Sequence, residues 1–159
     1  MIDAAGVPPI IRLIASPLGG IAVKLMATRA VTRGMIRANG HGGSLADGRI
    51  PSAWIDWRTS VARDTNSMHH ERAMVQAIVE GNSYRPGVTF VESELRAIEH
   101  RTLMLYGMTD PSGSQAVWSR FIDAMPNARI QLIDGAGHMA WLDQPGRMAS
   151  EIASFLKTY

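Results

Sequence analysis

The spacing of apolar residues along the chain predicts mostly helices. Between residues 10 and 36, apolar side chains recur every three or four positions, which is typical of amphipathic helices. Gly19-Gly20 is predicted to split this stretch into two helices, and Asn39-Gly40 to end it. A further helix is predicted to begin at Pro51, and another to cover Met68 to Glu80. No segment of this middle region alternates with a period of two, so we predict no strands there.

The last third of the chain has a different pattern. Thr102 to Tyr106 is an uninterrupted apolar run, as in a parallel strand that is buried on both faces. A helix from about Gln115 to Met125 follows, then a second strand from Arg129 to Ile133 and a final helix that begins near Pro145. Strand, helix, strand and helix joined by short loops form a βαβα unit, which implies parallel strands. Two strands make a small sheet, so the pattern indicates part of a larger α/β fold.

Composition and charge exclude several kinds of protein. The 159 residues are 46% hydrophobic and 19% charged, as in an ordinary globular domain. The formal net charge of +2 is too small to indicate a nucleic-acid partner. The sequence contains no cysteine, which excludes disulfides, thiolate metal sites and a cysteine nucleophile. The start of the chain lacks the basic stretch of a secretory signal, and we expect a cytoplasmic protein.

Basic residues are concentrated near the start of the chain. Five basic residues and no acidic ones occur between Ala4 and Ala46. A basic amphipathic stretch can lie on an anionic membrane surface. The apolar run is interrupted by Arg12, Pro17 and Lys24, so it cannot span a membrane. We favour helices with a solvated basic face and expect no membrane partner.

Metal and cofactor sites have little support in the sequence. The densest group of potential ligands is His69-His70-Glu71. Adjacent side chains on a helix point about 100° apart, so these residues cannot bind one ion as two ligands one turn apart would. We interpret them as a solvated helix face and expect neither a metal site nor a cofactor.

Two potential catalytic side chains follow the two predicted strands. Asp110 comes just after the first strand, and His138 follows the second in a loop that contains Gly135 and Gly137. Active sites form at the carboxyl ends of parallel strands, so both residues are expected at the same edge of the sheet. An aspartate that accepts a hydrogen bond from one imidazole nitrogen leaves the other nitrogen free to act as a base. We therefore identify Asp110 and His138 as candidate catalytic residues.

The segment from residue 94 to residue 157 carries a recognisable series of motifs. An apolar strand is followed by Gly-x-x-Asp-Pro, Pro-Asn-Ala precedes the last strand, and Gly-x-Gly-His is followed by a final helix that begins with proline. In this order and spacing, the segment resembles the C-terminal end of α/β-hydrolase-fold enzymes. Arg101 departs from the pattern, since many relatives have proline immediately before the penultimate strand. The resemblance implies that Asp110 is the orienting acid and His138 the general base of a catalytic triad.

The nucleophile that should precede this pair is absent from the sequence. In the family the nucleophile comes before the acid and the histidine, on a Gly-x-Ser-x-Gly turn, and the chain has no such motif. Gly40-His41-Gly42-Gly43 imitates an oxyanion-hole motif, but no core strand precedes it, and we interpret it as a helix-ending turn. By the resemblance, residues 1–6 end a core strand, residues 7–92 form a helical lid, and residues 93–159 form the C-terminal part of the core.

These observations predict a partial α/β-hydrolase fold and a C-terminal fragment of a lidded hydrolase that is inactive alone. The resemblance implies nucleophile-His-Asp hydrolysis of an ester or similar bond in a small apolar acyl or aryl substrate. Apolar side chains of the lid and beside the histidine are the candidate substrate contacts: Trp54, Trp57, Met68, Met74, Met139 and Trp141. For any single one of them, packing between helices is the simpler explanation.

Other interpretations stay open at this point. A lid with two strands could be a non-catalytic binding module that pairs through its open strand edge, as a homodimer or with a missing N-terminal part. The basic helices could instead bind a membrane surface. Within the enzyme class, an Asp nucleophile of the dehalogenase type is compatible with the sequence. Epoxide hydrolysis is disfavoured, because relatives use two lid tyrosines and the predicted lid contains only Tyr84.

Overall fold

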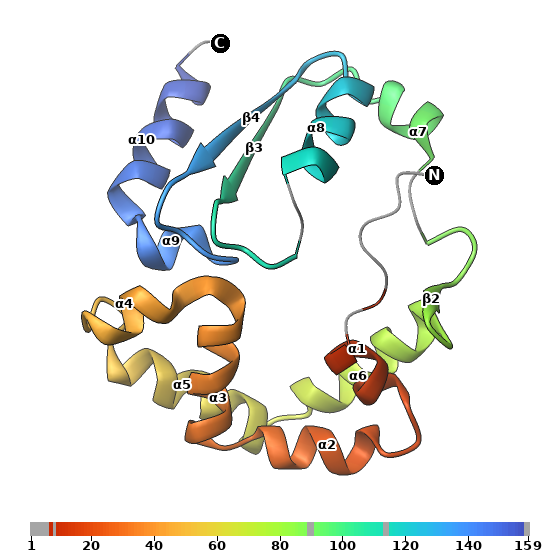
Figure 1. The fold of residues 1–159 in the computed structure, drawn as a ribbon, viewed down its shortest axis with the longest axis vertical. Helices are drawn as coiled ribbons and strands as arrows, with labels where there is room; N and C mark the ends of the chain where they lie inside the picture. Colours follow the sequence, from red (N-terminus) through yellow and green to blue (C-terminus); the bar gives the residue numbers. More distant parts are fainter. Residues whose placement is uncertain (1–6, 8, 89–90, 113–114, 158–159) are drawn as a thin grey trace. The chain divides into compact units, whose positions relative to one another are not determined.

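The computed structural model of the chain describes residue 7 and residues 9–88, 91–112 and 115–157. The described residues divide into two compact units (Figure 1). The first unit contains residues 7–35 and 51–88, and the second contains residues 36–50 and 91–157. The predicted end of a core strand at residues 1–6 lies outside the described residues.

The first unit is built from helices and one short hairpin. Its elements are α1 (Pro9–Ala15), α2 (Gly19–Met26), most of α3 (Arg29–Ile36), α5 (Ser52–Asp64), α6 (Ser67–Ile78), β1 (Val79–Glu80) and β2 (Ser83–Tyr84). Helices α1, α2 and α6 contact one another. Their buried apolar side chains form one core, as the helical spacing predicts: Val7, Ile14, Val23, Met68, Val75 and Val79.

Two local predictions for the first unit differ from the structure in detail. The predicted split into two helices is present, but the break falls at residues 16–18 and Gly19 and Gly20 begin α2. A Cβ atom at Gly19 would lie 1.9 Å from the carbonyl oxygen of Ile14, so only glycine allows this close approach of the two helices. The sixth helix ends at Ile78, and the two residues after it form a strand that pairs antiparallel with β2. Gly81, with a φ of 60°, reverses the chain between the strands. Two-residue strands are too short to show an alternating pattern, which explains why none was predicted.

The second unit carries the parallel strands. Its elements are the kinked turn η1 (Arg37–His41), α4 (Gly42–Ala46), α7 (Glu92–Arg96), β3 (Thr102–Gly107), α8 (Gln115–Ala124), β4 (Ala128–Ile133), α9 (Ala140–Asp143) and α10 (Pro145–Leu156). Figure 1 shows β3 and β4 side by side between α10 and α8. The strands pair in parallel from Thr102 opposite Ala128 to Gly107 opposite Ile133. The predicted βαβα unit is confirmed.

The small sheet is less covered than its apolar sequence predicts. In β3 only Gly107 is buried, and in β4 only Ile133, while nearly all the other strand residues are partly exposed. The expectation of a strand buried on both faces is therefore wrong for Thr102 to Tyr106. Among the described residues the sheet has two strands, so each strand keeps one unpaired edge.

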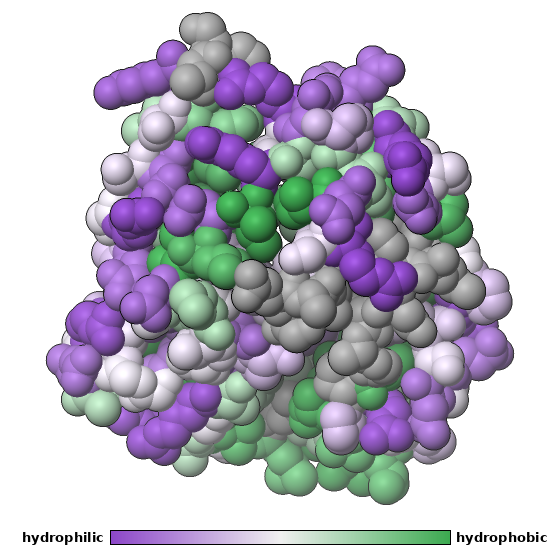
Figure 2. Space-filling view, turned by 45° about the horizontal axis from the view of Figure 1, so that its top comes forward, coloured by the Kyte–Doolittle hydropathy of each residue, from purple (hydrophilic) through white to green (hydrophobic). Residues whose placement is uncertain are grey.

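The face drawn in Figure 2 mixes hydrophilic side chains with apolar areas between them. Helix α2 exposes the large apolar side chains of Ile21 and Leu25, and Leu18 is exposed just before it. Ile21 and Leu25 are 63% and 66% exposed. Within the part of the chain that the structure describes, no helix combines the length and apolar character needed to cross a bilayer.

Candidate active site

Two loops leave the carboxyl ends of β3 and β4 together. The strands end in register, with Gly107 opposite Ile133. The loops that follow are then held to each other, because the backbone N–H of Met108 donates to the Ile133 carbonyl and that of Thr109 donates to the Ala136 carbonyl. A Cβ atom at Gly107 would lie 2.2 Å from the carbonyl oxygen of Gly137. The loops therefore approach each other more closely than any residue with a side chain at position 107 would allow.

Asp110 and His138 come together at this edge of the sheet. The distance from Asp110 Oδ2 to His138 Nδ1 is 2.9 Å. The Asp110 side chain is 5% exposed and the His138 side chain 51% exposed. With Nδ1–H donating to the carboxylate, Nε2 carries no proton and can accept one. The structure thus brings the two predicted catalytic residues into the geometry that a general base and its orienting acid require.

Asp110 is kept ionised by its hydrogen bonds. Burial by itself would raise the pKa of the carboxyl group, because it disfavours the charged form. The Ser112 backbone N–H and hydroxyl and the His138 ring counteract this effect, and the pKa of Asp110 is lowered overall. An ionised Asp110 can stabilise the imidazolium that forms when His138 takes up a proton.

Ser112 is the hydroxyl beside this pair, but its position does not suit a nucleophile. Its Oγ lies 3.2 Å from His138 Nδ1, the nitrogen that already faces Asp110. A serine activated by His138 would have to contact Nε2 instead. Ser112 therefore supports Asp110, through its N–H to Asp110 Oδ1 at 2.8 Å.

The remaining predicted site residues divide between the two units. Met139 is half-buried and Trp141 is 56% exposed, and both follow His138 in the second unit. Trp54 and Trp57 lie on α5 of the first unit, with ring centroids 6.2 Å apart, and Trp57 is 58% exposed. The structure does not place these two tryptophans relative to His138, and their role as substrate contacts stays a prediction.

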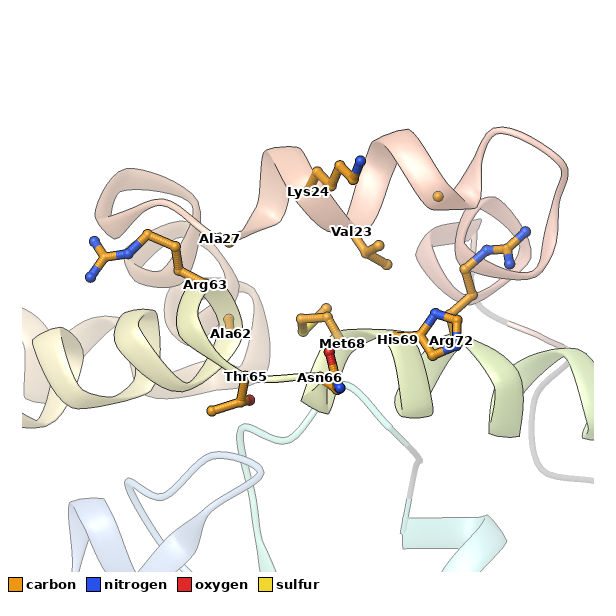
Figure 3. Close-up of a pocket in the computed structure, with 11 residues that line it drawn as sticks. Val23, Lys24, Ala27, Ala62, Arg63, Thr65, Asn66, Met68, His69 and Arg72 are labelled. Atoms are coloured by element: carbon orange, nitrogen blue, oxygen red, sulfur yellow. The ribbon is translucent and has the colours of Figure 1, made fainter.

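The first unit contains a pocket of about 420 Å³ between α2 and the junction of α5 and α6 (Figure 3). Val23 and Met68 face each other across it. Lys24 and Arg63 point away from it, and Arg63 is paired with Asp64. The lining is therefore mixed, since polar side chains also border the pocket: Thr65, Asn66, His69 and Arg72. No group of three potential metal-ligating side chains gathers anywhere in the described ranges.

The second unit, which carries Asp110 and His138, also contains a second histidine–carboxylate pair that the sequence did not predict. His41 Nδ1 lies 2.6 Å from Asp143 Oδ2, and both side chains are almost completely buried. His41 comes from the segment that we interpreted as a simple helix-ending turn, and 102 positions separate the two residues. The glycine-rich run around His41 was the one local signal, and it did not identify Asp143 as the partner.

The lowered pKa values of two carboxyl groups predict how acid affects the stability of the fold. The pKa values of Asp110 and Asp143 are both lowered, against burial, by hydrogen bonds to the ionised form. The unfolded chain takes up these protons near the ordinary value of 3.8, while the folded chain does not. We therefore expect the free energy of unfolding to fall as the pH drops below about 4.

Urea unfolding at a series of pH values measures this loss. Asp110→Asn removes one of the two groups, so its unfolding midpoint should change less between about pH 5 and about pH 3 than that of the wild type. Asp134→Asn, at an exposed position, is the matched control and should follow the wild type. Equal acid sensitivity in Asp110→Asn and the wild type would contradict the role given to Asp110.

Comparison with known proteins supports the fold. No family model matches the chain. A rat protein described as a putative protein-lysine deacylase, ABHD14B, is 36% identical over 56 residues, which are 35% of this chain and 26% of that protein. The solved structure of Est816, described as an N-acyl homoserine lactone degrading enzyme, superposes with a TM-score of 0.59 at 17% identity, over 94% of this chain. This chain has part of the α/β-hydrolase fold.

The two matches cover only part of the length of the known proteins. The chain spans about half of the lactone-degrading enzyme (52%) and about a quarter of the deacylase (26%). The descriptions of the two proteins, as a putative protein-lysine deacylase and as an N-acyl homoserine lactone degrading enzyme, are statements about those proteins. What the chain shares with the solved structure is the fold.

Proposed function

We propose that this chain supplies the general base and the orienting acid of a hydrolase that cleaves an ester or related acyl bond by nucleophilic catalysis. The observation that carries the proposal is the 2.9 Å contact between His138 Nδ1 and Asp110 Oδ2, with half of the imidazole exposed beyond it. In this reaction His138 Nε2 removes the proton of the nucleophile, and Asp110 stabilises the imidazolium. His138 then returns the proton to the leaving group, and it activates the water that cleaves the acyl intermediate.

The nucleophile comes from outside these 159 residues in this proposal. The sequence has no Gly-x-Ser-x-Gly turn, and Ser112 contacts the wrong nitrogen of His138. The partly exposed strands support the same conclusion, because the two strands that pair among the described residues leave room for neighbouring strands on both sides. A strand that carries the nucleophile on its following turn would complete the triad at the carboxyl edge.

An apolar acyl or aryl group is the proposed substrate. Large apolar side chains are exposed near the histidine and on the first unit, at Trp141, Met108, Ile21, Leu25 and Trp57. A lid formed by the first unit would cover the substrate with such side chains and exclude water.

Labelling with a fluorophosphonate, together with hydrolysis of a short p-nitrophenyl ester, tests the proposal. The 159-residue chain alone should show no labelled serine and should hydrolyse the ester no faster than its His138→Ala variant. The same chain expressed with the in-frame coding sequence upstream of Met1 should be labelled and should hydrolyse the ester.

Three results would overturn parts of this proposal. A labelled serine in the 159-residue chain, with turnover that depends on His138, would place the nucleophile inside it. A stop codon directly upstream of Met1 would show that the nucleophile is not on the same polypeptide. An extended protein that hydrolyses no ester, lactone or amide would contradict the hydrolase function itself.

The open edges of the β3–β4 sheet also favour a second candidate, a non-catalytic module that pairs through a strand edge. In that case the chain should form a defined dimer or heteromer by strand addition, and His138→Ala should leave this assembly unchanged. Size-exclusion chromatography with light scattering separates the two cases, since a stable monomer argues against edge pairing.

A further inference from the structure

The buried pair of His41 and Asp143 has no part in the proton transfers proposed above. Their side chains are 0% and 1% exposed, and the 2.6 Å contact joins the turn η1 to the helix α9. Burying an ionisable pair is costly unless its hydrogen bonds are satisfied. The pair therefore needs an explanation in terms of what it holds in place.

Three consecutive backbone N–H groups around the general base donate hydrogen bonds to this pair and to the turn η1. The N–H of Gly137 donates to Asp143 Oδ2 at 2.8 Å, and the N–H of Met139 donates to His41 Nε2 at 3.1 Å. Between them, the N–H of His138 donates to the carbonyl oxygen of Asn39 at 2.9 Å. The backbone on both sides of the catalytic imidazole is thus fixed by one side-chain pair and the turn next to it.

These hydrogen bonds determine the state of His41. Because Nε2 accepts the N–H of Met139, it carries no proton, so the ring proton is on Nδ1 and is donated to Asp143. Burial alone would raise the pKa of Asp143. The Gly137 N–H, the Ser44 hydroxyl and His41 outweigh burial and lower it. A neutral histidine and an ionised aspartate therefore fit the hydrogen bonds that His41 and Asp143 Oδ2 make to each other and to the backbone N–H groups of Gly137 and Met139.

The same turn also contacts the loop that carries Asp110. The Thr109 hydroxyl donates to the carbonyl oxygen of Gly40 at 3.0 Å. Gly40 has a φ of 86°, and a Cβ atom there would lie 2.2 Å from the Thr109 carbonyl oxygen and 3.1 Å from Gly137 Cα. Asn39 and Gly40, the two residues just before His41, therefore lie against both catalytic loops, the one before Asp110 and the one before His138.

We infer that His41 and Asp143 are positioning residues for the general base. They hold the backbone of residues 137–139 so that His138 Nδ1 stays within hydrogen-bond distance of Asp110, which keeps His138 in the tautomer with a free Nε2. The inference rests on the proposed function, because it assigns the pair to the base of that reaction. A purely structural pair would stabilise the fold without affecting the tautomer of His138.

Nitrogen-15 NMR of the imidazole rings in the 159-residue chain tests the inference directly. In the wild type, neutral His138 should be mainly the Nδ1–H tautomer. The double variant His41→Phe with Asp143→Leu removes both polar groups and leaves no unpaired buried charge. It should shift His138 toward a mixture of tautomers and speed hydrogen exchange at the amides of residues 137–139 by at least about tenfold, the effect expected for losing one net hydrogen bond.

Asp143→Asn keeps the test informative if the double variant does not fold. An asparagine of the same size can still accept the Gly137 N–H through its amide oxygen, but more weakly than a carboxylate. Its His138 tautomer ratio should lie between those of the wild type and the double variant. His100→Phe, at an exposed position in the same unit, is the matched control and should leave the tautomer and the exchange rates unchanged.

The outcomes separate this inference from the proposed function. Asp110→Asn should shift the His138 tautomer by itself, and if it does not, the Asp110–His138 pair of the proposed function is wrong. If Asp110→Asn shifts the tautomer while every folded variant of His41 and Asp143 keeps the wild-type ratio, the positioning role is overturned and the proposed function stands.

Discussion

Replacing His138 by alanine should lower kcat by about six orders of magnitude in the hydrolase that combines this chain with its nucleophile, if serine proteases are a guide. In the proposed reaction the imidazole removes the proton of the nucleophile and later protonates the leaving group. Both steps use Nε2, the nitrogen that the contact with Asp110 leaves free. The Michaelis constant should change little, because His138 acts on the reacting atoms and contributes little to ground-state binding.

Asp110→Asn should have a smaller effect, a loss of about 10⁴-fold in kcat, because the general base remains but in the wrong tautomer. His100→Ala, an exposed histidine of the same unit, is the matched control and should keep wild-type turnover. Steady-state hydrolysis of a p-nitrophenyl ester by the extended protein measures all three variants. Turnover in His138→Ala within tenfold of the wild type would remove His138 from the mechanism.

Gly107→Ala should destabilise the second unit by about 3 kcal/mol, the upper end of what overpacking usually costs. An added Cβ would lie 2.2 Å from the Gly137 carbonyl oxygen and 2.4 Å from that of Ala136. Both are backbone atoms, which cannot rotate away as a flexible side chain would. One of the two loops after the strands must then move, and the hydrogen bond from Thr109 N–H to the Ala136 carbonyl is the first to be strained.

Gly146→Ala provides the matched comparison for this variant. Gly146 lies in α10, where an added Cβ would meet no atom within 4 Å. Its free energy of unfolding should stay the same or rise by up to about 1 kcal/mol, since alanine favours a helix over glycine. Thermal unfolding followed by circular dichroism compares the two variants. Equal stability of Gly107→Ala and the wild type would show that the two loops are not as closely packed as the structure has them.

The Asp110–His138 pair could be predicted because it depends on strand order more than on side-chain detail. Two apolar runs with a helix between them can hardly form anything other than a parallel pair, and parallel strands end at the same edge. A polar residue a few positions beyond each strand is therefore expected at that edge of the sheet. The motif series around both residues added the family resemblance and so the roles of acid and base.

The His41–Asp143 pair could not be predicted in this way. Neither residue follows a strand, and the turn that carries His41 belongs to a stretch of helical spacing that the sequence assigns to a lid. Residues 36–50 instead pack with the C-terminal part of the chain. A contact between positions 102 residues apart has no periodicity that a single sequence displays.

The sequence by itself determined the order of the helices and strands, the parallel pair, and the edge at which Asp110 and His138 meet. These features follow from hydrophobic spacing and from the direction of the chain, which are local properties. Only the tertiary structure decided which groups hold the histidine loop, because the N–H groups of residues 137–139 find their acceptors in a distant turn and in Asp143. Buried N–H donors must find acceptors among the groups that folding brings near them. The local sequence does not show which groups these are.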